Sequence, residues 1–224
     1  MTLTCLIPAY NEAARIAAVL NAVLDHPLID EVIVIDDGST DGTAHVAATF
    51  PKARLIALPH NIGKTAALAQ GLRQASGDLI LLLDADLSGL SPHHLTALIT
   101  PVRDGHADLS ISLRANAPAL WRWIGLDYIS GERVLHRTLL TPHHETLQSL
   151  PKFGFEVFLN ALAISRNARI SVTRWPEVKS PLKSQKYGLW AGVKADVKML
   201  RDLSKAVGTL GLVRQIVRMR GLRV

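Results

Sequence analysis

Two aspartates separated by one residue, Asp84 and Asp86, follow an apolar run in this sequence. Carboxylates with this spacing at the end of a buried strand emerge close together, and they offer the hard oxygen ligands that Mg²⁺ or Mn²⁺ prefers. A metal ion held there would bridge the phosphates of a nucleotide and neutralise a leaving diphosphate. The same triplet is also compatible with two solvated carboxylates in a turn. The surrounding sequence must decide between these two interpretations.

The first half of the chain places its acidic, glycine and lysine residues in loops that follow apolar, strand-like runs. These loops are 8–12, 36–39, 61–64 and 84–86, after strands expected at 3–8, 31–36, 53–58 and 78–83. Helical patterns at 12–24, 43–50 and 63–75 separate the strands. This alternation predicts an α/β fold, a Rossmann-like and mostly parallel sheet flanked by helices, in which the carboxyl ends of the strands meet. We therefore expect the four loops to form one site.

The second half of the chain is less regular. It predicts helices over 92–102 and 155–163, strands over 107–113 and 169–175, and a surface loop at 176–188. We expect a single catalytic domain over 1–188, with a nucleotide-binding half at 1–90 and an acceptor half at 91–188. A basic, amphipathic helical tail is expected at 189–224.

Composition narrows the class of protein. The 224 residues are 48% hydrophobic and contain one cysteine, Cys5, in an apolar run. A chain of this length can bury a core without disulfides, and the lone thiol suits a reducing compartment. No apolar run reaches the roughly 18 residues that span a bilayer, and the N-terminus lacks a secretory pattern. We expect a cytoplasmic protein at the inner face of the cell membrane.

The net charge of +6 predicts an acidic partner, and the excess lies in the tail. From Lys186 to the end, nine Lys or Arg residues face two Asp, with apolar residues interleaved at helical spacing. A basic amphipathic helix is typical of contact with an anionic membrane surface, although a solvated helix packed on the domain would have the same pattern. Nucleic acid is not expected as a partner, because no nucleic-acid motif occurs and aromatic residues do not alternate with the basic ones.

Taken together, the four loops resemble the N-terminal signature of family 2 glycosyltransferases in order and spacing. The matching segments are Ile7-Pro8-Ala9-Tyr10-Asn11-Glu12, Val34-Ile35-Asp36-Asp37-Gly38-Ser39-Thr40-Asp41-Gly42-Thr43, Asn61-Ile62-Gly63-Lys64-Thr65-Ala66-Ala67-Leu68 and Leu83-Asp84-Ala85-Asp86-Leu87-Ser88. The resemblance covers roughly the first 90 residues. It implies the A-type glycosyltransferase fold, a nucleoside diphosphate sugar as donor and a divalent metal, Mg²⁺ or Mn²⁺.

The resemblance also implies roles for individual residues. Those that match the family's base and ribose contacts are Pro8, Tyr10, Glu12 and Asp36 or Asp37, and Lys64 matches a residue near the nucleotide. Asp84 and Asp86, with Ala85 between them, match the ribose and metal ligands. For Asp36 and Asp37 an alternative is turn and helix-cap chemistry, which Gly38, Ser39 and Asp41 favour.

Three later segments resemble the dolichyl- or polyprenyl-phosphate sugar synthase branch of this family. They are Asp127 to Arg137, Phe153 to Val157 and Lys183 to Gly188. In that branch, arginines matching Arg133 and Arg137 attract the acceptor phosphate, and Lys186 would add positive charge. This chain departs from the pattern with Glu132 where the branch has an aromatic residue.

Glu132 therefore has several possible roles. For a hydroxyl acceptor it would be the general base of an inverting transfer, whereas a phosphate acceptor needs no base. The alternative is an ion pair with Arg133 or Arg137 on a helix. For Asp127 the two possible roles are likewise direct catalysis and positioning of the catalytic groups. Together with Asp86, these residues are the candidate catalytic groups: Asp86, Asp127, Glu132 and Arg133.

Two histidine pairs, His93-His94 and His143-His144, are not expected to bind metal. Adjacent residues of a helix point in different directions, and neither pair has Cys or His partners at ligand spacing.

The function that these patterns favour is inverting transfer of a sugar from a UDP- or GDP-sugar to a polyprenyl phosphate or another membrane-associated acceptor. Transfer to a glycan or small-molecule hydroxyl, with Glu132 or Asp127 as base, remains open. A protein of another class, a nucleotide-binding scaffold without turnover, would keep the same loops but lack transfer.

Overall fold

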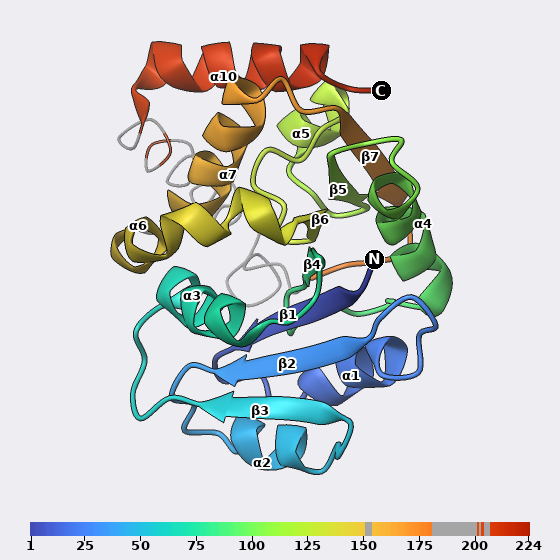
Figure 1. The fold of residues 1–224 in the computed structure, drawn as a ribbon, viewed down its shortest axis with the longest axis vertical. Helices are drawn as coiled ribbons and strands as arrows, with labels where there is room; N and C mark the ends of the chain where they lie inside the picture. Colours follow the sequence, from blue (N-terminus) through green and yellow to red (C-terminus); the bar gives the residue numbers. More distant parts are fainter. Residues whose placement is uncertain (151–153, 181–200, 202, 204–206) are drawn as a thin grey trace.

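The structure, a computed structural model, describes residues 1–150, 154–180, 201, 203 and 207–224. In these residues a seven-stranded sheet with the strand order β3-β2-β1-β4-β6-β5-β7 forms the centre of the molecule (Figure 1). The strands are β1 (Leu3–Ala9), β2 (Glu31–Asp36), β3 (Ala53–Ala57), β4 (Leu79–Leu82), β5 (Leu109–Arg114), β6 (Arg133–His136) and β7 (Ile170–Trp175). The predicted mostly parallel α/β sheet is confirmed.

One strand runs against the others and was missing from the prediction. β6 pairs antiparallel with β4 on one side and with β5 on the other, while the remaining pairs are parallel. The alternative in which Glu132 forms an ion pair with Arg133 or Arg137 on a helix is therefore wrong about the helix, because Arg133 begins β6. Because β6 runs in reverse, it begins at the edge of the sheet where β4 ends. The residues just before Arg133 are thus placed beside those just after β4.

Helices cover both faces of the sheet (Figure 1). They are α1 (Ile16–Val23), α2 (Thr43–Ala48), α3 (Lys64–Gln74), α4 (Pro92–Arg103), α5 (Ala119–Ile124), α6 (His144–Ser149), α7 (Gly154–Ser165) and α10 (Thr209–Gly221), with 3₁₀ turns η1 (Arg137–Leu139) and η2 (Thr141–His143). The expected helices over 63–75, 92–102 and 155–163 are present within about two residues at each end.

Two apolar clusters, one on each face, form the core. β4 contributes Ile80 and Leu82 to the cluster under α3 and α7, and Leu79 and Leu81 to the cluster under α1 and α4. A strand covered on both faces must be apolar throughout, which explains the unbroken run of β4. Cys5 is fully buried in the second cluster and packs there as a small hydrophobe.

The helix α10 packs against α7 through a buried face that includes Leu212 and Met219. The C-terminus then pairs with the start of β7 through hydrogen bonds between the backbones of Ile170, Leu222 and Val224. The predicted motif at 183–188, Lys186 and most of 189–206 lie outside the described residues, so the helical tail at 189–224 stays a prediction. No helix in the part of the chain described here is both long and apolar enough to cross a bilayer.

Candidate functional site

The carboxyl edge of the parallel strands brings together the four loops predicted from the sequence. β1, β2 and β3 end side by side, since Ala9 pairs with Asp36 and Asp36 with Ala57. β4 lies next to β1 and leads directly into the segment that begins at Leu83. Acidic and basic side chains from separate loops therefore meet at one edge of the sheet.

Lys64, the first residue of α3, lies between two carboxylates at this edge. Its Nζ is 2.6 Å from Oδ1 of Asp84 and 3.6 Å from Oε1 of Glu156. Burial acts to lower the pKa of Lys64, but the two carboxylates raise it above its ordinary value. Burial likewise acts to raise the pKa of Asp84, and Lys64 and Arg114 hold it below the ordinary range. Both groups of the pair are therefore charged at neutral pH.

Gly131 allows the segment before β6 to approach this pair. A Cβ at residue 131 would lie 2.6 Å and 2.8 Å from the carboxylate oxygens of Asp84, and 2.8 Å from Nζ of Lys64. Real Cβ atoms do not make contacts this short, so a side chain at residue 131 would require the ends of the Asp84 and Lys64 side chains to move. The backbone of the segment before β6 thus lies directly against the Lys64–Asp84 pair.

Asp86 is placed among other negative groups. Its Oδ1 is buried and has no hydrogen-bond partner. Burial, together with Asp84 and Glu12, raises the pKa of Asp86 to about 6. A cation would relieve both the repulsion and the unpaired oxygen, so the residues present fit a divalent metal. Ala85, between the two aspartates, is buried.

The two aspartates that follow β2 differ in their environment. Both carboxylate oxygens of Asp37 accept backbone N–H groups of the next loop, from Ile62 at 2.8 Å and Gly63 at 2.9 Å. Asp36 is also buried, but its Oδ1 has no partner, while its Oδ2 accepts from the N–H of Ser39 at 3.3 Å. Asp37 therefore fixes the loop that leads into α3, and Asp36 retains a free acceptor.

The loop after β1 presents the remaining nucleotide candidates. Tyr10 is 47% exposed, and Pro8 and Glu12 are partly buried. The carboxylate of Glu12 pairs with Arg15 at 2.5 Å, and its backbone N–H donates to Thr43 Oγ1 at 2.8 Å. These contacts hold the loop at the edge of the site and leave the Tyr10 ring accessible to a ligand.

Glu132 is fully buried, and its partners are not those that the sequence suggested. Its Oε2 accepts from the hydroxyls of Ser112 at 2.6 Å and Ser130 at 2.9 Å. Its Oε1 is 3.4 Å from Nη1 of Arg114. The alternative of an ion pair with Arg133 or Arg137 is therefore not formed, and the arginine beside Glu132 is Arg114.

Arg114, at the end of β5, is a residue that the sequence reasoning missed. Its largely buried guanidinium faces Glu132. The positive charge of Arg114 also acts to lower the pKa of Asp84 and the pKa of Asp127. Its Nε is buried without a partner. The signal that could have found it is its position at the carboxyl end of a predicted strand.

Asp127 lies wholly buried beside this cluster. Its Oδ1 accepts from the N–H of Ile129 at 3.2 Å, and its Oδ2 has no partner. Burial, and then the nearby charge of Glu132, raise the pKa of Asp127 to about 6, while Arg114 acts in the opposite direction. Asp127 can thus be protonated at mildly acidic pH.

The guanidinium of Arg133 is fully buried and its donors are occupied by the protein. Nε donates to the carbonyl of Ser130 at 2.8 Å, Nη1 to Asn160 at 2.7 Å and Nη2 to the carbonyl of Tyr128 at 3.0 Å. Arg133 therefore holds the segment before β6 in shape. This geometry favours a positioning role over direct contact with an acceptor.

Arg137 lies at the other end of the sheet. The side-chain Nε of Arg137 donates to the carbonyl of Gly77 at 2.8 Å. The backbone N–H of Arg137 donates to the carbonyl of Asp78, just before β4 begins. The site is formed where β4 ends. The structure therefore does not bring Arg137 together with Asp84 and Lys64.

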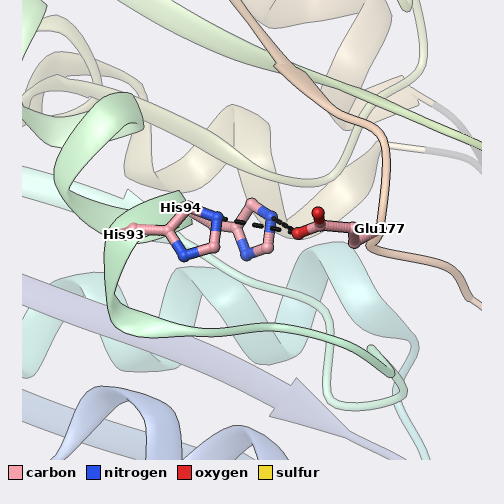
Figure 2. Close-up of side chains that lie close together, drawn as sticks. All are labelled: His93, His94 and Glu177. Atoms are coloured by element: carbon pink, nitrogen blue, oxygen red, sulfur yellow. Dashed lines mark ion pairs between the residues drawn. The ribbon is translucent and has the colours of Figure 1, made fainter.

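The first histidine pair also differs from expectation. The rings of His93 and His94 do not point apart, since their centroids are 3.9 Å from each other, and both face Glu177 (Figure 2). The partner is a glutamate far along the chain, so no local spacing revealed it.

Comparisons with known proteins agree with this arrangement. The family model described as glycosyl transferase family 2 matches residues 4–162. A dolichyl-phosphate beta-glucosyltransferase of Trichomonas vaginalis is 38% identical over 37% of this chain and 28% of its own length. An undecaprenyl-phosphate 4-deoxy-4-formamido-L-arabinose transferase of Serratia proteamaculans is 36% identical over 51% of this chain and 37% of its own length. The chain thus matches about a third of the length of these curated relatives.

Solved structures extend the likeness over more of the chain. Glucosyl-3-phosphoglycerate synthase from Mycobacterium tuberculosis, in complex with Mn²⁺, uridine diphosphate (UDP) and glucosyl-3-phosphoglycerate, is 28% identical with a TM-score of 0.67. The match covers 86% of this chain and 77% of the synthase. The complex of the same enzyme with phosphoglyceric acid has a TM-score of 0.68 and covers 83% and 74%. These structures share the A-type glycosyltransferase fold with the present one. The chain belongs to glycosyl transferase family 2.

Proposed function

We propose that this chain transfers a sugar from UDP-sugar to the phosphate of a polyprenyl lipid with inversion at the anomeric carbon. The observation that supports this most directly is the meeting of Asp84, Asp86 and Lys64 at the carboxyl edge with the backbone of Gly131. Carboxylates for a metal, a lysine for phosphate and the start of the acceptor half are then within one small region. UDP is favoured over GDP because the neighbouring synthase structures contain it.

The donor side of the proposal assigns separate tasks to the loops. Asp36, with its free acceptor oxygen, would bind the base or ribose, and the exposed ring of Tyr10 would stack on the base together with the Pro8 loop. Asp37 would act as a positioning residue, because both of its oxygens already hold the next loop. Lys64 would turn from Asp84 toward the diphosphate when the donor binds.

Asp86 and Asp84 would hold the divalent metal, Mg²⁺ or Mn²⁺. A metal held by these two carboxylates would stabilise the negative charge of the diphosphate leaving group. Mn²⁺ is the ion present in the neighbouring synthase structures. The free oxygen of Asp86 and its raised pKa support the assignment in this chain.

A phosphate acceptor agrees better with the buried carboxylates than a hydroxyl acceptor does. Glu132 and Asp127 are both 0% exposed, and the oxygens of Glu132 face two hydroxyls and Arg114. A phosphate oxygen is already a nucleophile and needs no base. We therefore assign Glu132 to holding Arg114, whose charge would attract the acceptor phosphate, and Arg133 to shaping the neighbouring segment.

A hydroxyl acceptor is a second candidate, favoured by the glucosyl-3-phosphoglycerate complex of a neighbour. In that case Asp127, with its unpartnered oxygen and a pKa of about 6, would be a better base than Glu132. This base would need to become accessible when the acceptor binds. Its Asp127→Asn variant would then lose turnover by roughly 10²-fold or more.

The deciding experiment offers radiolabelled UDP-glucose and Mn²⁺ to the purified chain together with three acceptors in parallel. These are a polyprenyl phosphate, the matching polyprenol and 3-phosphoglycerate. We expect label in the lipid phase only with the polyprenyl phosphate, and its loss when a chelator is added. Label in the polyprenol or phosphoglycerate fraction would replace the lipid-phosphate assignment with the hydroxyl one. Metal-dependent binding of UDP-sugar without transfer or donor hydrolysis would instead identify a scaffold.

We also propose that α10 places the protein on the cytoplasmic face of the membrane. Its outer face exposes Leu210, Val213 and Val217 at 87%, 55% and 63%, beside the exposed Arg214 and Arg218. Apolar residues flanked by arginines on one helix face suit an anionic lipid surface. Gln215 of the same helix accepts from Tyr128 Oη at 2.5 Å, which connects α10 to the segment before β6. Contact with lipid would thus bring the acceptor half toward its substrate.

A further inference from the structure

A second cluster of ligand-type side chains lies outside the transfer site. His93 and His94 are in the first turn of α4, and Glu177 follows β7 (Figure 2). One ligand atom from each of the three lies within 4.8 Å of the others. The three side chains thus converge on one point, although 83 residues separate His94 from Glu177 in the sequence.

The distances in this cluster are compatible with a shared metal ion. Nε2 of His94 is 3.3 Å and Nε2 of His93 is 3.7 Å from Oε2 of Glu177. Nε2 of His94 is buried and has no hydrogen-bond partner. Ligands bound at about 2.0–2.1 Å in a tetrahedron are roughly 3.3 Å apart, so an ion fits between these atoms with small side-chain movements.

A single hydroxyl orients both imidazole rings. Oγ of Ser91 is 2.8 Å from Nδ1 of His93 and 2.8 Å from Nδ1 of His94. The backbone N–H of Ser91 also donates to Nδ1 of His94 at 3.2 Å. For Nε2 of His94 to bind an ion, its Nδ1 would have to exchange this bond for donation to Oγ of Ser91. A hydrogen bond of this kind to the far nitrogen is typical of histidines that bind metal.

Helix capping explains only part of the arrangement. Ser91 and His94 form a capping box at the start of α4, which uses Nδ1 of His94. Capping makes no use of Nε2 of His94, of His93 or of Glu177. The negative charge of Glu177 offsets the positive end of the α4 dipole.

We propose that His93, His94 and Glu177 bind one transition-metal ion of the zinc type, separate from the ion of the Asp84–Asp86 pair. Two imidazoles and one carboxylate are a set that Zn²⁺ accepts, with water in the fourth position. The softer nitrogen ligands distinguish this site from the all-oxygen site, which suits Mg²⁺ or Mn²⁺.

The ion would link two segments that are already in contact, the one after Asp86 and the one after β7. Ser88 and Lys179 exchange backbone hydrogen bonds of 2.8 Å and 3.0 Å, and a Cβ at Gly89 would lie 2.5 Å from the carbonyl oxygen of Glu177. Ser88 is only two residues beyond Asp86. A metal at this junction would therefore hold the turn of the transfer site against the segment after β7, and would close a long chain loop.

Zinc titration of the metal-free protein by calorimetry tests the proposal. Glu177→Gln and His93→Ala remove ligands that are about two-thirds exposed, so both variants should keep the fold, whereas the buried His94 is left in place. We expect one Zn²⁺ per wild-type chain and an affinity that is roughly tenfold or more weaker in each variant. His45→Ala removes an exposed histidine of α2 and should bind as the wild type does.

Two further measurements separate this site from the transfer site. Asp86→Asn should keep the bound Zn²⁺, because that variant changes only the other carboxylate pair. Zn²⁺ without nucleotide should raise the melting temperature of the wild type but not of Glu177→Gln. Absence of stoichiometric Zn²⁺ binding by the wild type, or unchanged binding in Glu177→Gln and His93→Ala, would overturn the proposal. Neither result depends on whether sugar transfer occurs.

Discussion

The backbone at Gly131 lies so close to the carboxylate of Asp84 that a Cβ there would be 2.6 Å from Oδ1. This contact joins the first residue of the proposed metal site to the segment before β6. We expect Gly131→Ala to displace the ends of the Lys64 and Asp84 side chains, with little loss of stability because both ends are flexible. The value of kcat/KM for sugar transfer should fall by at least tenfold. Gly221→Ala is the matched control, since a Cβ at residue 221 meets nothing within 4 Å. Equal activities of the two variants would contradict the role of this contact.

Lys64 provides a second test, because a similar ion pair elsewhere in the chain serves as its control. Nζ of Lys52 is also 2.6 Å from a carboxylate, that of Asp25, but both side chains are at least 70% exposed. An exposed pair contributes little, about 0–1 kcal/mol. Lys64→Met should lower kcat/KM by roughly 10²-fold, because the leaving diphosphate loses a fixed positive group. Lys52→Met should change it less than about twofold. Steady-state kinetics of both variants measure these changes. Equal losses of kcat/KM in the two variants would show that Lys64 has no specific role in transfer.

Glu132→Gln distinguishes support of Arg114 from base catalysis. The amide keeps the shape of the side chain but weakens its attraction for the guanidinium 3.4 Å away. With a polyprenyl phosphate as acceptor, we expect KM for the acceptor to rise several-fold, kcat to change little and the pH profile to keep its shape. If the turnover rate instead falls by roughly 10²-fold or more, and the acidic limb of the profile disappears, Glu132 is a general base. The double variant with Arg114→Met should be less than additive, since both changes act on one contact.

Asp127 makes a contribution to stability that depends on pH. Its pKa is raised to about 6 in the folded chain, so between about pH 4 and pH 6 the folded state binds more protons at this residue than the unfolded state does. Its contribution therefore favours folding at low pH and is lost as pH rises through 6. The free energy of unfolding of Asp127→Asn minus that of the wild type should increase by on the order of 2 kcal/mol from pH 4.5 to pH 7.5. Urea unfolding of both proteins at the two pH values measures this difference, and a constant difference would contradict the raised pKa.

Contact of α10 with lipid can be measured apart from catalysis. Replacing the 87% exposed Leu210 with Asp places a negative charge on the proposed membrane face without disturbing the core. We expect weaker co-sedimentation with anionic vesicles, and little binding of either protein to neutral vesicles. His45→Asp, on the exposed side of α2, introduces the same residue far from α10 in the sequence and should leave sedimentation unchanged. Equal vesicle binding by all three proteins would remove α10 from the interface.

The parallel half of the fold was predictable because its signals are local. Each strand up to β4 is an apolar run followed by a polar loop, and the helices between them repeat at regular spacing. β6 was missed because its four residues begin and end with charged or polar groups, Arg133 and His136. Short strands inserted between others are determined by tertiary pairing rather than by periodicity.

The same distinction holds for the site. Asp84, Asp86 and Lys64 were found because each follows its strand, and parallel strands align their ends. The contacts of Arg114 with Glu132, and of Glu177 with His94, join residues from distant parts of the chain. No spacing rule connects such residues before the fold is known. Arg137 shows the reverse case, since a plausible motif placed it near the site and the direction of β6 carries it away.

The position of β6 has a consequence for how this chain folds during synthesis. β4 pairs with β1 on one side, but its other neighbour, β6, is made about 50 residues later. Until then, the Leu79–Leu82 run is an uncovered strand edge without charge or proline, the kind of edge that associates with other chains. A fragment that ends near residue 90 would keep this edge permanently. We therefore expect a fragment of residues 1–90 to aggregate, because pairing with β6 is what covers this edge in the whole chain.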